Sequence, residues 1–91
     1  MKNKSLWKKY KENNDQNAKE ELIKENVKLV KMIAGRLFSK YNGKVSFDDL
    51  VGYGSIGLID AIEKFDYKRD IKFTTYANIR IRGAIIDQLR S

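Results

Sequence analysis

The apolar residues of the chain recur with α-helical spacing over three long stretches. Over residues 17–41 they alternate at steps of three and four, with lysines and glutamates between them, at Ile23, Val27, Val30, Ala34, Leu37 and Tyr41. This pattern predicts one long amphipathic helix that ends near residue 41. Before it, Leu6, Trp7 and Tyr10 predict a short helix, which the polar run NNDQN separates from the rest.

The second stretch covers residues 47–65, after a turn signal at residues 42–44. Ser46 precedes Asp49 by three residues, which resembles a capping box. The residues expected on the buried side are Leu50, Leu58, Ala61, Ile62 and Phe65. A third helix follows the charged segment DYKRDIKF, and we expect Thr74 or Thr75 to cap it. Its expected buried residues are Ala77, Ile81, Ala84, Ile85 and Leu89.

Strand-like alternation of useful length is missing from the sequence, so we expect an all-α fold, a small bundle of three main helices plus the short N-terminal helix. Residues 1–16 are expected to form this short helix and a linker, and residues 17–91 the helical domain. Helical rhythm continues to Ser91 without a Gly or Asn stop signal. We therefore expect the domain to be part of a longer protein.

The composition excludes several kinds of chemistry. The 91 residues include no Cys and no His, which excludes thiol nucleophiles, disulfides, zinc fingers and imidazole bases. No apolar run approaches the roughly 20 residues that span a bilayer, and the N-terminus lacks the apolar centre of a signal peptide. We expect a cytoplasmic protein that is not an enzyme and uses no cofactor or metal.

The net charge of +7 and a pI near 9.7 are typical of chains that bind nucleic acid. Bacterial chains from AT-rich genomes are also rich in lysine, so charge alone does not decide between the two explanations.

Glycines and acidic residues stand out within the second predicted helix. Gly52, Gly54 and Gly57 each cost up to about 1 kcal/mol relative to Ala in a helix interior. They indicate either close packing inside the domain or a bare surface that receives a partner's helix, since their spacing fits no phosphate-binding loop. Asp48 and Asp49 point in different directions, so they suit the helix dipole or an exposed docking contact better than a metal site.

The last helix has an unusual outward face. Two neighbouring stripes on it contain Tyr76, Arg80, Gly83, Asp87 and Arg90, and Thr75, Ile79, Arg82 and Ile86. Cations that follow phosphates and aromatic rings that stack on bases suit single-stranded nucleic acid. Upstream, the same mixture continues with Phe65, Tyr67, Lys68, Arg69, Lys72 and Phe73. Core packing is the alternative for the two phenylalanines, and a solvated face for the cations.

The segment FDDLVGYGSIGLIDAIEKFDYKRDIKFTTYANIRIRGAIIDQLRS resembles region two of bacterial RNA polymerase sigma factors, and its final YANIRIRGAIIDQLRS is most similar to the flagellar or motility type. The likeness extends over residues 25–91, with the segments in order and at matching spacing. It implies an all-helical domain with two surfaces. One docks on a coiled coil of the clamp in the polymerase's largest subunit, and the other melts and reads the promoter minus-ten element.

The resemblance also implies roles for individual residues. The docking residues would be Asp48, Asp49, Leu50, Gly52, Tyr53 and Ser55. The DNA-reading residues would be Phe65, Asp66, Arg69, Ile71, Lys72, Phe73, Thr75, Tyr76 and Ile79, and the outward face of the last helix adds Arg80, Arg82, Gly83 and Ile86. Tyr76 would stack on a flipped non-template adenine, while Arg69 and Lys72 hold phosphates.

Four positions, in two adjacent pairs, differ from the housekeeping members of the family. Those members have tryptophans where Ile79 and Arg80 stand, and an amide and a carboxylate where Gly52 and Tyr53 stand. An aliphatic wedge at Ile79 has less stacking area, which would favour strict promoters over easily melted ones. The alternative function is a helical interaction module that binds polymerase or an anti-sigma factor without reading DNA.

Overall fold

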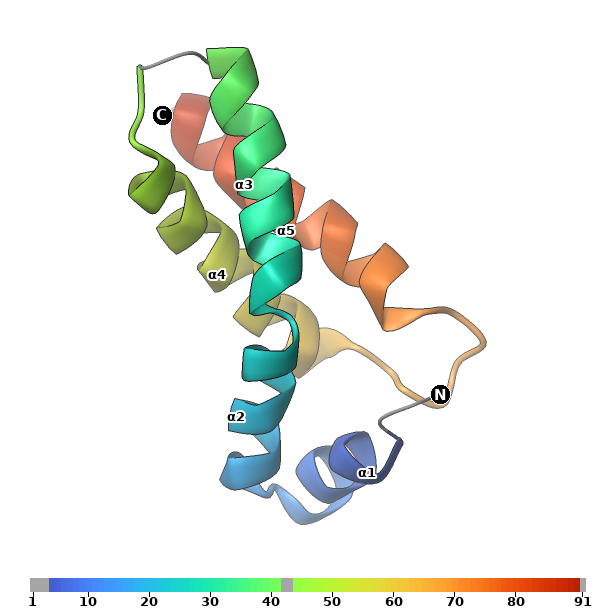
Figure 1. Cartoon of the computed structure of the whole chain (residues 1–91). Helices are drawn as coiled ribbons and strands as arrows, with labels where there is room; N and C mark the ends of the chain where they lie inside the picture. The colour runs from blue at the N-terminus through green and yellow to red at the C-terminus, as the bar shows by residue number, and fades with distance from the viewer. Residues whose placement is uncertain (1–3, 42–43, 91) are drawn as a thin grey trace.

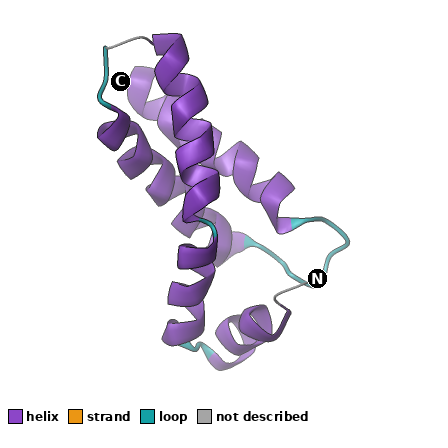
Figure 2. Cartoon of the chain, viewed as in Figure 1, coloured by secondary structure: helices purple, strands orange, loops and turns teal. Residues whose placement is uncertain are grey.

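The computed structural model describes residues 4–41 and 44–90, which form five helices (Figure 1). The helices are α1 (Lys4–Asn13), α2 (Gln16–Glu25), α3 (Val27–Tyr41), α4 (Phe47–Lys64) and α5 (Phe73–Arg90). These two ranges contain no strand (Figure 2), so the predicted all-α fold class is confirmed. None of the five helices is both long enough and apolar enough to cross a bilayer.

The prediction of one helix over residues 17–41 is wrong, because the helix breaks at Asn26. The Asn26 side-chain amide donates to the Leu22 carbonyl oxygen at 2.7 Å, and its backbone N–H donates to the Ile23 oxygen at 3.1 Å. An Asn side chain that bonds to nearby backbone competes with the regular helical ladder and favours a helix end. The break separates α2, which packs on α1 and α4, from α3, which packs on α4 and α5.

The start of α4 is as predicted. The Ser46 hydroxyl accepts a hydrogen bond from the Asp49 N–H at 3.0 Å and so caps the helix. The helix ends at Lys64, one residue before the predicted end. Of the turn expected over residues 42–44, Asn42 and Gly43 lie outside the described residues, and the Lys44 N–H donates to the Tyr41 carbonyl oxygen at 3.3 Å.

The start of α5 differs from the prediction that Thr74 or Thr75 caps it. The helix begins at Phe73, and the Tyr76 N–H donates to the Lys72 carbonyl oxygen at 3.3 Å. Because this carbonyl already accepts the first helical bond, Lys72 occupies the cap position. Both threonines are therefore exposed residues of the first turn.

The core contains side chains from all five helices. Its buried members are Trp7, Leu22, Val30, Ile33, Ala34, Leu37, Leu50, Leu58, Ala61, Ile62, Phe65, Phe73, Ala77, Ile81 and Ile85. The predicted core residues that are only half-buried are Ile23, Val27, Tyr41, Ala84 and Leu89. Leu22 and Ile33, which the single-helix pattern left out, take core positions on either side of the break at Asn26.

The three glycines of α4 divide between the two interpretations of the sequence. A Cβ atom on Gly57 would lie 2.8 Å from the Arg80 carbonyl oxygen, and one on Gly54 would lie 2.9 Å from Val30 Cγ1. Side-chain carbons do not come that close to other heavy atoms, so these two glycines allow close helix packing. Gly52 has no such neighbour within 4 Å and leaves a bare, exposed stretch of helix.

Candidate nucleic-acid and polymerase interfaces

An aromatic cluster joins α1 to the two ends of the segment between α4 and α5. The ring centroids are 5.1 Å apart for Trp7 and Phe65, 5.0 Å for Trp7 and Phe73, 5.1 Å for Phe65 and Phe73, and 5.5 Å for Phe65 and Tyr76. These separations suit favourable aromatic pairs. Phe65 and Phe73 are buried, which confirms their core packing. Tyr76 is half-buried and carries the cluster to the surface.

A hollow of about 400 Å³ opens beside Tyr76. It is lined by Lys64, Phe65, Asp66, Arg69, Asp70, Ile71 and Tyr76. All of these except Lys64 and Asp70 belong to the surface predicted to read DNA. Small-molecule sites have volumes of about 300–1,000 Å³, so the hollow has the size needed to accept one planar base.

The guanidinium group of Arg80 lies over the Tyr76 ring and forms an ion pair with Asp60 of α4. The Arg80 guanidinium carbon lies 5.1 Å from the ring centroid. Arg80 Nη1 also donates to Asp60 Oδ2 at 2.7 Å, and Lys64 Nζ lies 2.7 Å from Asp60 Oδ1. Hydrogen bonds from Lys64 first and Arg80 second hold the pKa of Asp60 below its usual range. Tyr76 is therefore oriented by α4 before any ligand arrives.

The outward face of α5 lies where its helical spacing predicts. Its exposed members are Thr75, Ile79, Arg82, Asp87 and Arg90, and its half-buried members are Tyr76, Arg80, Gly83 and Ile86. Ile79 is 72% exposed, the largest value among the exposed large hydrophobic side chains of the described residues. A Cβ on Gly83 would meet nothing within 4 Å, so this position leaves room for a ligand.

The segment of residues 65–72 places three exposed cations next to the aromatic cluster, Lys68, Arg69 and Lys72. Asp66 shapes it, because its Oδ1 accepts from the Lys68 N–H at 3.1 Å and its carbonyl oxygen accepts from the Arg69 N–H at 3.2 Å. The carboxylate predicted to line the DNA site thus also holds the turn. Ile71 follows, 43% exposed.

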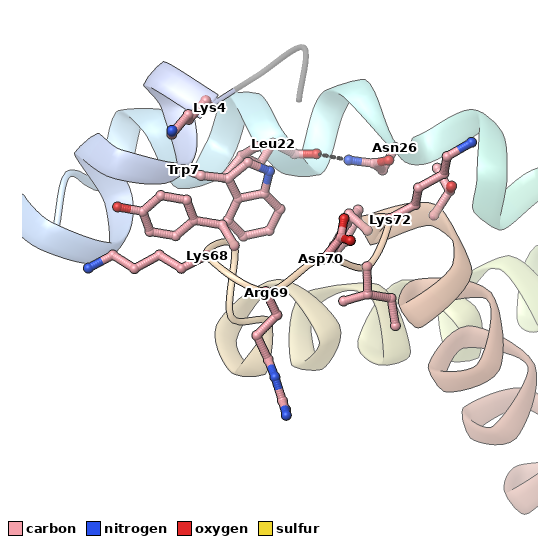
Figure 3. A pocket seen from close by; sticks show the side chains of 12 residues that line it. Lys4, Trp7, Leu22, Asn26, Lys68, Arg69, Asp70 and Lys72 are labelled. Carbon is pink, nitrogen blue, oxygen red and sulfur yellow. Dashed lines mark hydrogen bonds between the residues drawn. The ribbon is translucent and has the colours of Figure 1, made fainter.

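A wider hollow of about 860 Å³ lies between this segment, α1 and the junction of α2 with α3 (Figure 3). Its lining includes Lys4, Trp7 and Asn26, none of which the sequence assigned to a site. Figure 3 shows the Trp7 ring between α1 and the segment that carries Lys68, while the Arg69 side chain points away from it. The sequence feature that could have indicated a role for Trp7 is that it is the only tryptophan of the chain and stands in a polar N-terminal stretch.

The predicted polymerase-binding residues lie on the first half of α4. Asp48, Asp49 and Gly52 are exposed, Tyr53 and Ser55 are half-buried, and Leu50 is fully buried. Leu50 supports the helix from the core and does not reach its surface. The Ser55 hydroxyl donates to the Val51 carbonyl oxygen at 2.8 Å, within the same helix. No group of acidic side chains in the described ranges is arranged to hold a metal ion.

Two isoleucines extend this surface, although the sequence-based prediction of the docking residues did not include them. Ile56 is 65% exposed and Ile59 is 37% exposed. They follow Gly52 by four and seven residues, so all three lie on one face of α4. The spacing of Asp49, Gly52, Ile56 and Ile59 was the signal that could have revealed this face.

Comparison with known proteins shows the family to which this helical domain belongs. The Sigma-70 region 2 family matches residues 22–91. RNA polymerase sigma-D factor of Bacillus subtilis (strain 168) is 48% identical over 85 residues, which cover 93% of this chain and 34% of that protein. RNA polymerase sigma factor FliA of Pseudomonas aeruginosa is 44% identical over 75 residues, covering 82% of this chain and 30% of that protein. FliA of Escherichia coli (strain K12) is 45% identical over 73 residues, covering 80% and 30%.

This chain spans about a third of the length of these curated relatives. The family match runs from α2 through α5 and includes the hollow beside Tyr76 and the exposed face of α4. Sigma factors are transcription initiation factors and not enzymes. With a family match over most of its length and relatives at 44–48% identity, the chain belongs to the sigma-70 family of RNA polymerase sigma factors as a region 2 domain.

Proposed function

We propose that this chain is the part of a flagellar-type initiation factor that docks on RNA polymerase and captures flipped bases of the promoter minus-ten element. The observation that carries the proposal is the hollow beside Tyr76, where an oriented ring lies next to Arg69 and Lys64. Stacking on bases and attraction to phosphates together are what single-stranded DNA offers a protein. Such a factor acts in the cytoplasm, with the polymerase.

In this proposal the three kinds of side chain have separate roles. Tyr76 is the platform on which a displaced non-template adenine stacks, and Phe65 supports it from the core. Arg69 and Lys72 hold the phosphates on either side of that base. Ile79 is the wedge that occupies the space the base leaves in the duplex.

The energies indicate that base capture needs help. Flipping a base costs a few kcal/mol, and stacking on one aromatic ring returns roughly 1–3 kcal/mol. Tyr76 alone therefore does not melt a promoter. Phosphate contacts and tethering to the polymerase, which raises the local concentration of the domain at the DNA, supply the rest.

The tether in this proposal is the exposed face of α4, and its partner is the coiled coil of the clamp in the largest polymerase subunit. Gly52 lets a partner helix approach the backbone closely, since nothing covers it. Ile56 and Ile59 supply apolar contact area beside it. Asp48 and Asp49 add negative charge that attracts basic residues of the partner.

The proposal is tested by fluorescence anisotropy with two labelled single strands, the minus-ten non-template sequence and a scrambled version of it. We expect the minus-ten strand to bind more tightly, both affinities to fall steeply with salt, and duplex DNA to bind weakly. Equal binding of both strands would contradict base capture and leave a merely basic surface.

Two substitutions separate base capture from phosphate attraction. Tyr76→Ala should weaken binding of the minus-ten strand by about 1–3 kcal/mol and of the scrambled strand by less, so the preference between the strands falls. Arg69→Ala should weaken both strands alike and lower the salt dependence by about one counterion. If Tyr76→Ala weakens both strands equally, the ring does not select the captured base of the minus-ten element.

A second candidate function is a helical interaction module that binds polymerase or an anti-sigma factor and reads no DNA. The exposed isoleucines of α4 favour it, because they offer a protein-binding face that needs no DNA. It predicts polymerase binding that depends on Ile56, together with equal affinity for the two single strands.

A further inference from the structure

Helix α1 contacts residues at both ends of the segment of residues 65–72, although α1 precedes the residues 22–91 that match the family. Trp7 is 2% exposed, and its ring lies 5.1 Å from Phe65 and 5.0 Å from Phe73, centroid to centroid. Phe65 follows α4 directly and Phe73 begins α5. One indole ring therefore fixes the points where the segment leaves one helix and enters the next.

Further contacts of α1 reach the middle of the segment and the end of α4. The Tyr67 hydroxyl donates a hydrogen bond to the Glu12 carboxylate, which lowers the pKa of Glu12. Lys11 Nζ donates to the Glu63 carbonyl oxygen at 2.6 Å. The segment is thus held by α1 at its ends and in its middle.

Trp7 and Glu12 contact residues near the hollow beside Tyr76 but do not line that hollow themselves. Phe65 and Tyr76 line the hollow with their centroids 5.5 Å apart, and Trp7 packs behind Phe65. Neither Trp7 nor Glu12 lines that hollow. Any influence they have on a bound base must pass through Phe65 and the backbone of the segment.

We propose that Trp7 and Glu12 are positioning residues for base capture, which hold Phe65 and the segment in the arrangement that lets Tyr76 receive a displaced base. The proposal rests on the proposed function of the Tyr76 hollow. It assigns to α1 a part in reading DNA that goes beyond holding the fold together. A base site has to be held closely to its productive geometry, and supporting residues that lock it are the usual means.

The first test compares Glu12→Ala with Glu20→Ala in the full chain. Both replace an exposed helical glutamate by alanine, but Glu20 lies on α2. The readout is the ratio of affinities for the labelled minus-ten strand and for the same strand with an abasic site at the captured adenine. Loss of a negative charge alone should slightly raise the affinity for both strands. We expect Glu12→Ala to lower the ratio by about threefold and Glu20→Ala to leave it unchanged.

The second test combines Glu12→Ala with Tyr67→Phe, which removes only the hydroxyl that bonds to Glu12. If the bond acts as proposed, either change lowers the ratio, and the double variant lowers it no further than one change does. Independent, additive losses would overturn the role of this bond.

The third test is Trp7→Phe, which keeps an apolar ring in the core. We expect the ratio to fall by about fivefold while binding of the abasic strand is retained. A purely structural role would instead lower the binding of both strands in proportion to the unfolded fraction, which circular dichroism measures. An unchanged ratio in folded Trp7→Phe and Glu12→Ala would overturn the proposal and leave the function of the hollow intact.

Amide hydrogen exchange separates failure of this proposal from failure of base capture, because it needs no DNA. Residues 66–72 should exchange faster in Glu12→Ala and Trp7→Phe than in the unaltered chain, while α3 keeps its protection. If the unaltered chain shows no preference for the intact strand, base capture is wrong and with it the role assigned to α1. Faster exchange would then still show that α1 holds the segment, and unchanged exchange would refute that as well.

Discussion

The outer faces of α4 and α5 differ in how much of their geometry the protein fixes. On α5, Tyr76 is held between Phe65 and Arg80, and Arg80 is held in turn by Asp60. On α4, the face around Gly52 offers bare helix and two exposed isoleucines. A base must be placed in one orientation, so its proposed site is built from connected side chains. A partner helix needs shape and apolar area, and a small residue provides the access.

The two faces nevertheless depend on one contact between the helices that carry them. Gly57 of α4 lies against the backbone of Arg80 and Ile81 of α5, and Gly54 lies against Ile81 and Ile85. Changes at this contact should affect both faces together, whereas changes on either outer surface should affect one face only.

The largest effect is expected for Gly57→Ala. The new Cβ would lie 2.8 Å from the Arg80 carbonyl oxygen and 2.9 Å from Ile81 Cα, and backbone atoms cannot move aside as a flexible side chain does. We expect a loss of about 1–3 kcal/mol in the free energy of unfolding, measured by urea denaturation, with weaker binding of both DNA and polymerase. Gly52→Ala is the matched control in the same helix.

That control should have the opposite sign. No atom lies within 4 Å of the Cβ position at Gly52, so alanine should raise the free energy of unfolding by up to about 1 kcal/mol through helix propensity alone. If a partner helix approaches Gly52 closely, the same change should weaken polymerase binding although the fold is more stable. Equal destabilisation by both substitutions would show that the two glycines do not differ in packing.

The next largest effects are expected for Ile56→Asp and Ile79→Asp, each of which should weaken the binding of a different partner. The two side chains are 65% and 72% exposed, so Ile56→Asp and Ile79→Asp should each change the free energy of unfolding by no more than about 0.5 kcal/mol. We expect Ile56→Asp to weaken polymerase binding by about 2 kcal/mol and leave single-strand binding at high salt unchanged, as measured by anisotropy against each partner. Ile79→Asp should do the reverse.

Loss of both activities in both variants would contradict two separate surfaces. A negative charge on either face also repels DNA at long range, so the DNA measurements need a salt series. The specific effect of Ile79→Asp should persist at high salt, because it removes an apolar wedge as well as adding charge.

Much of the helical framework follows from local patterns in the sequence. Periodicity placed α4 almost to the residue, and the spacing of Ser46 and Asp49 fixed its start. The break in the first long helix did not follow, because the side chain of Asn26 bonds to the Leu22 carbonyl oxygen in a way that apolar periodicity does not register. The start of α5 was displaced because Lys72, which has no capping side chain, takes the cap position through its backbone.

The candidate sites were predictable where one helix carries them and less so where several helices meet. The outward face of α5 follows from helical spacing alone, whereas the sequence left open which of the three glycines of α4 is exposed. Trp7 could not be placed beside Phe65 and Phe73, because the pairing of distant residues depends on how α1 folds back on the bundle. The surroundings of Tyr76 were likewise unpredictable, because the Arg80 guanidinium over its ring forms an ion pair with Asp60 of another helix.

The smallest effect is expected when the ion pair between Asp60 and Arg80 is weakened by lowering the pH. The pKa of Asp60 is lowered in the folded chain by Lys64 first and then by Arg80, so its ionised form stabilises the fold. That contribution is complete above the unfolded-state pKa of about 4 and is lost as pH falls through the lower, folded-state value. The Asp60 side chain is 35% exposed and solvent screens it, so the loss should stay below about 1 kcal/mol.

Urea denaturation of the unaltered chain and of Asp60→Asn, at neutral pH and at about pH 3, isolates this contribution. The pKa of Glu12 is also lowered, so the unaltered chain should lose stability in acid for more than one reason. Because Glu12 is the same in both proteins, the difference between them belongs to Asp60. We expect a smaller loss in Asp60→Asn, and an identical loss would mean that Arg80 holds Tyr76 without help from α4. Tyr76 would then be held by Phe65 and Arg80 without the further connection from Arg80 to Asp60 of α4.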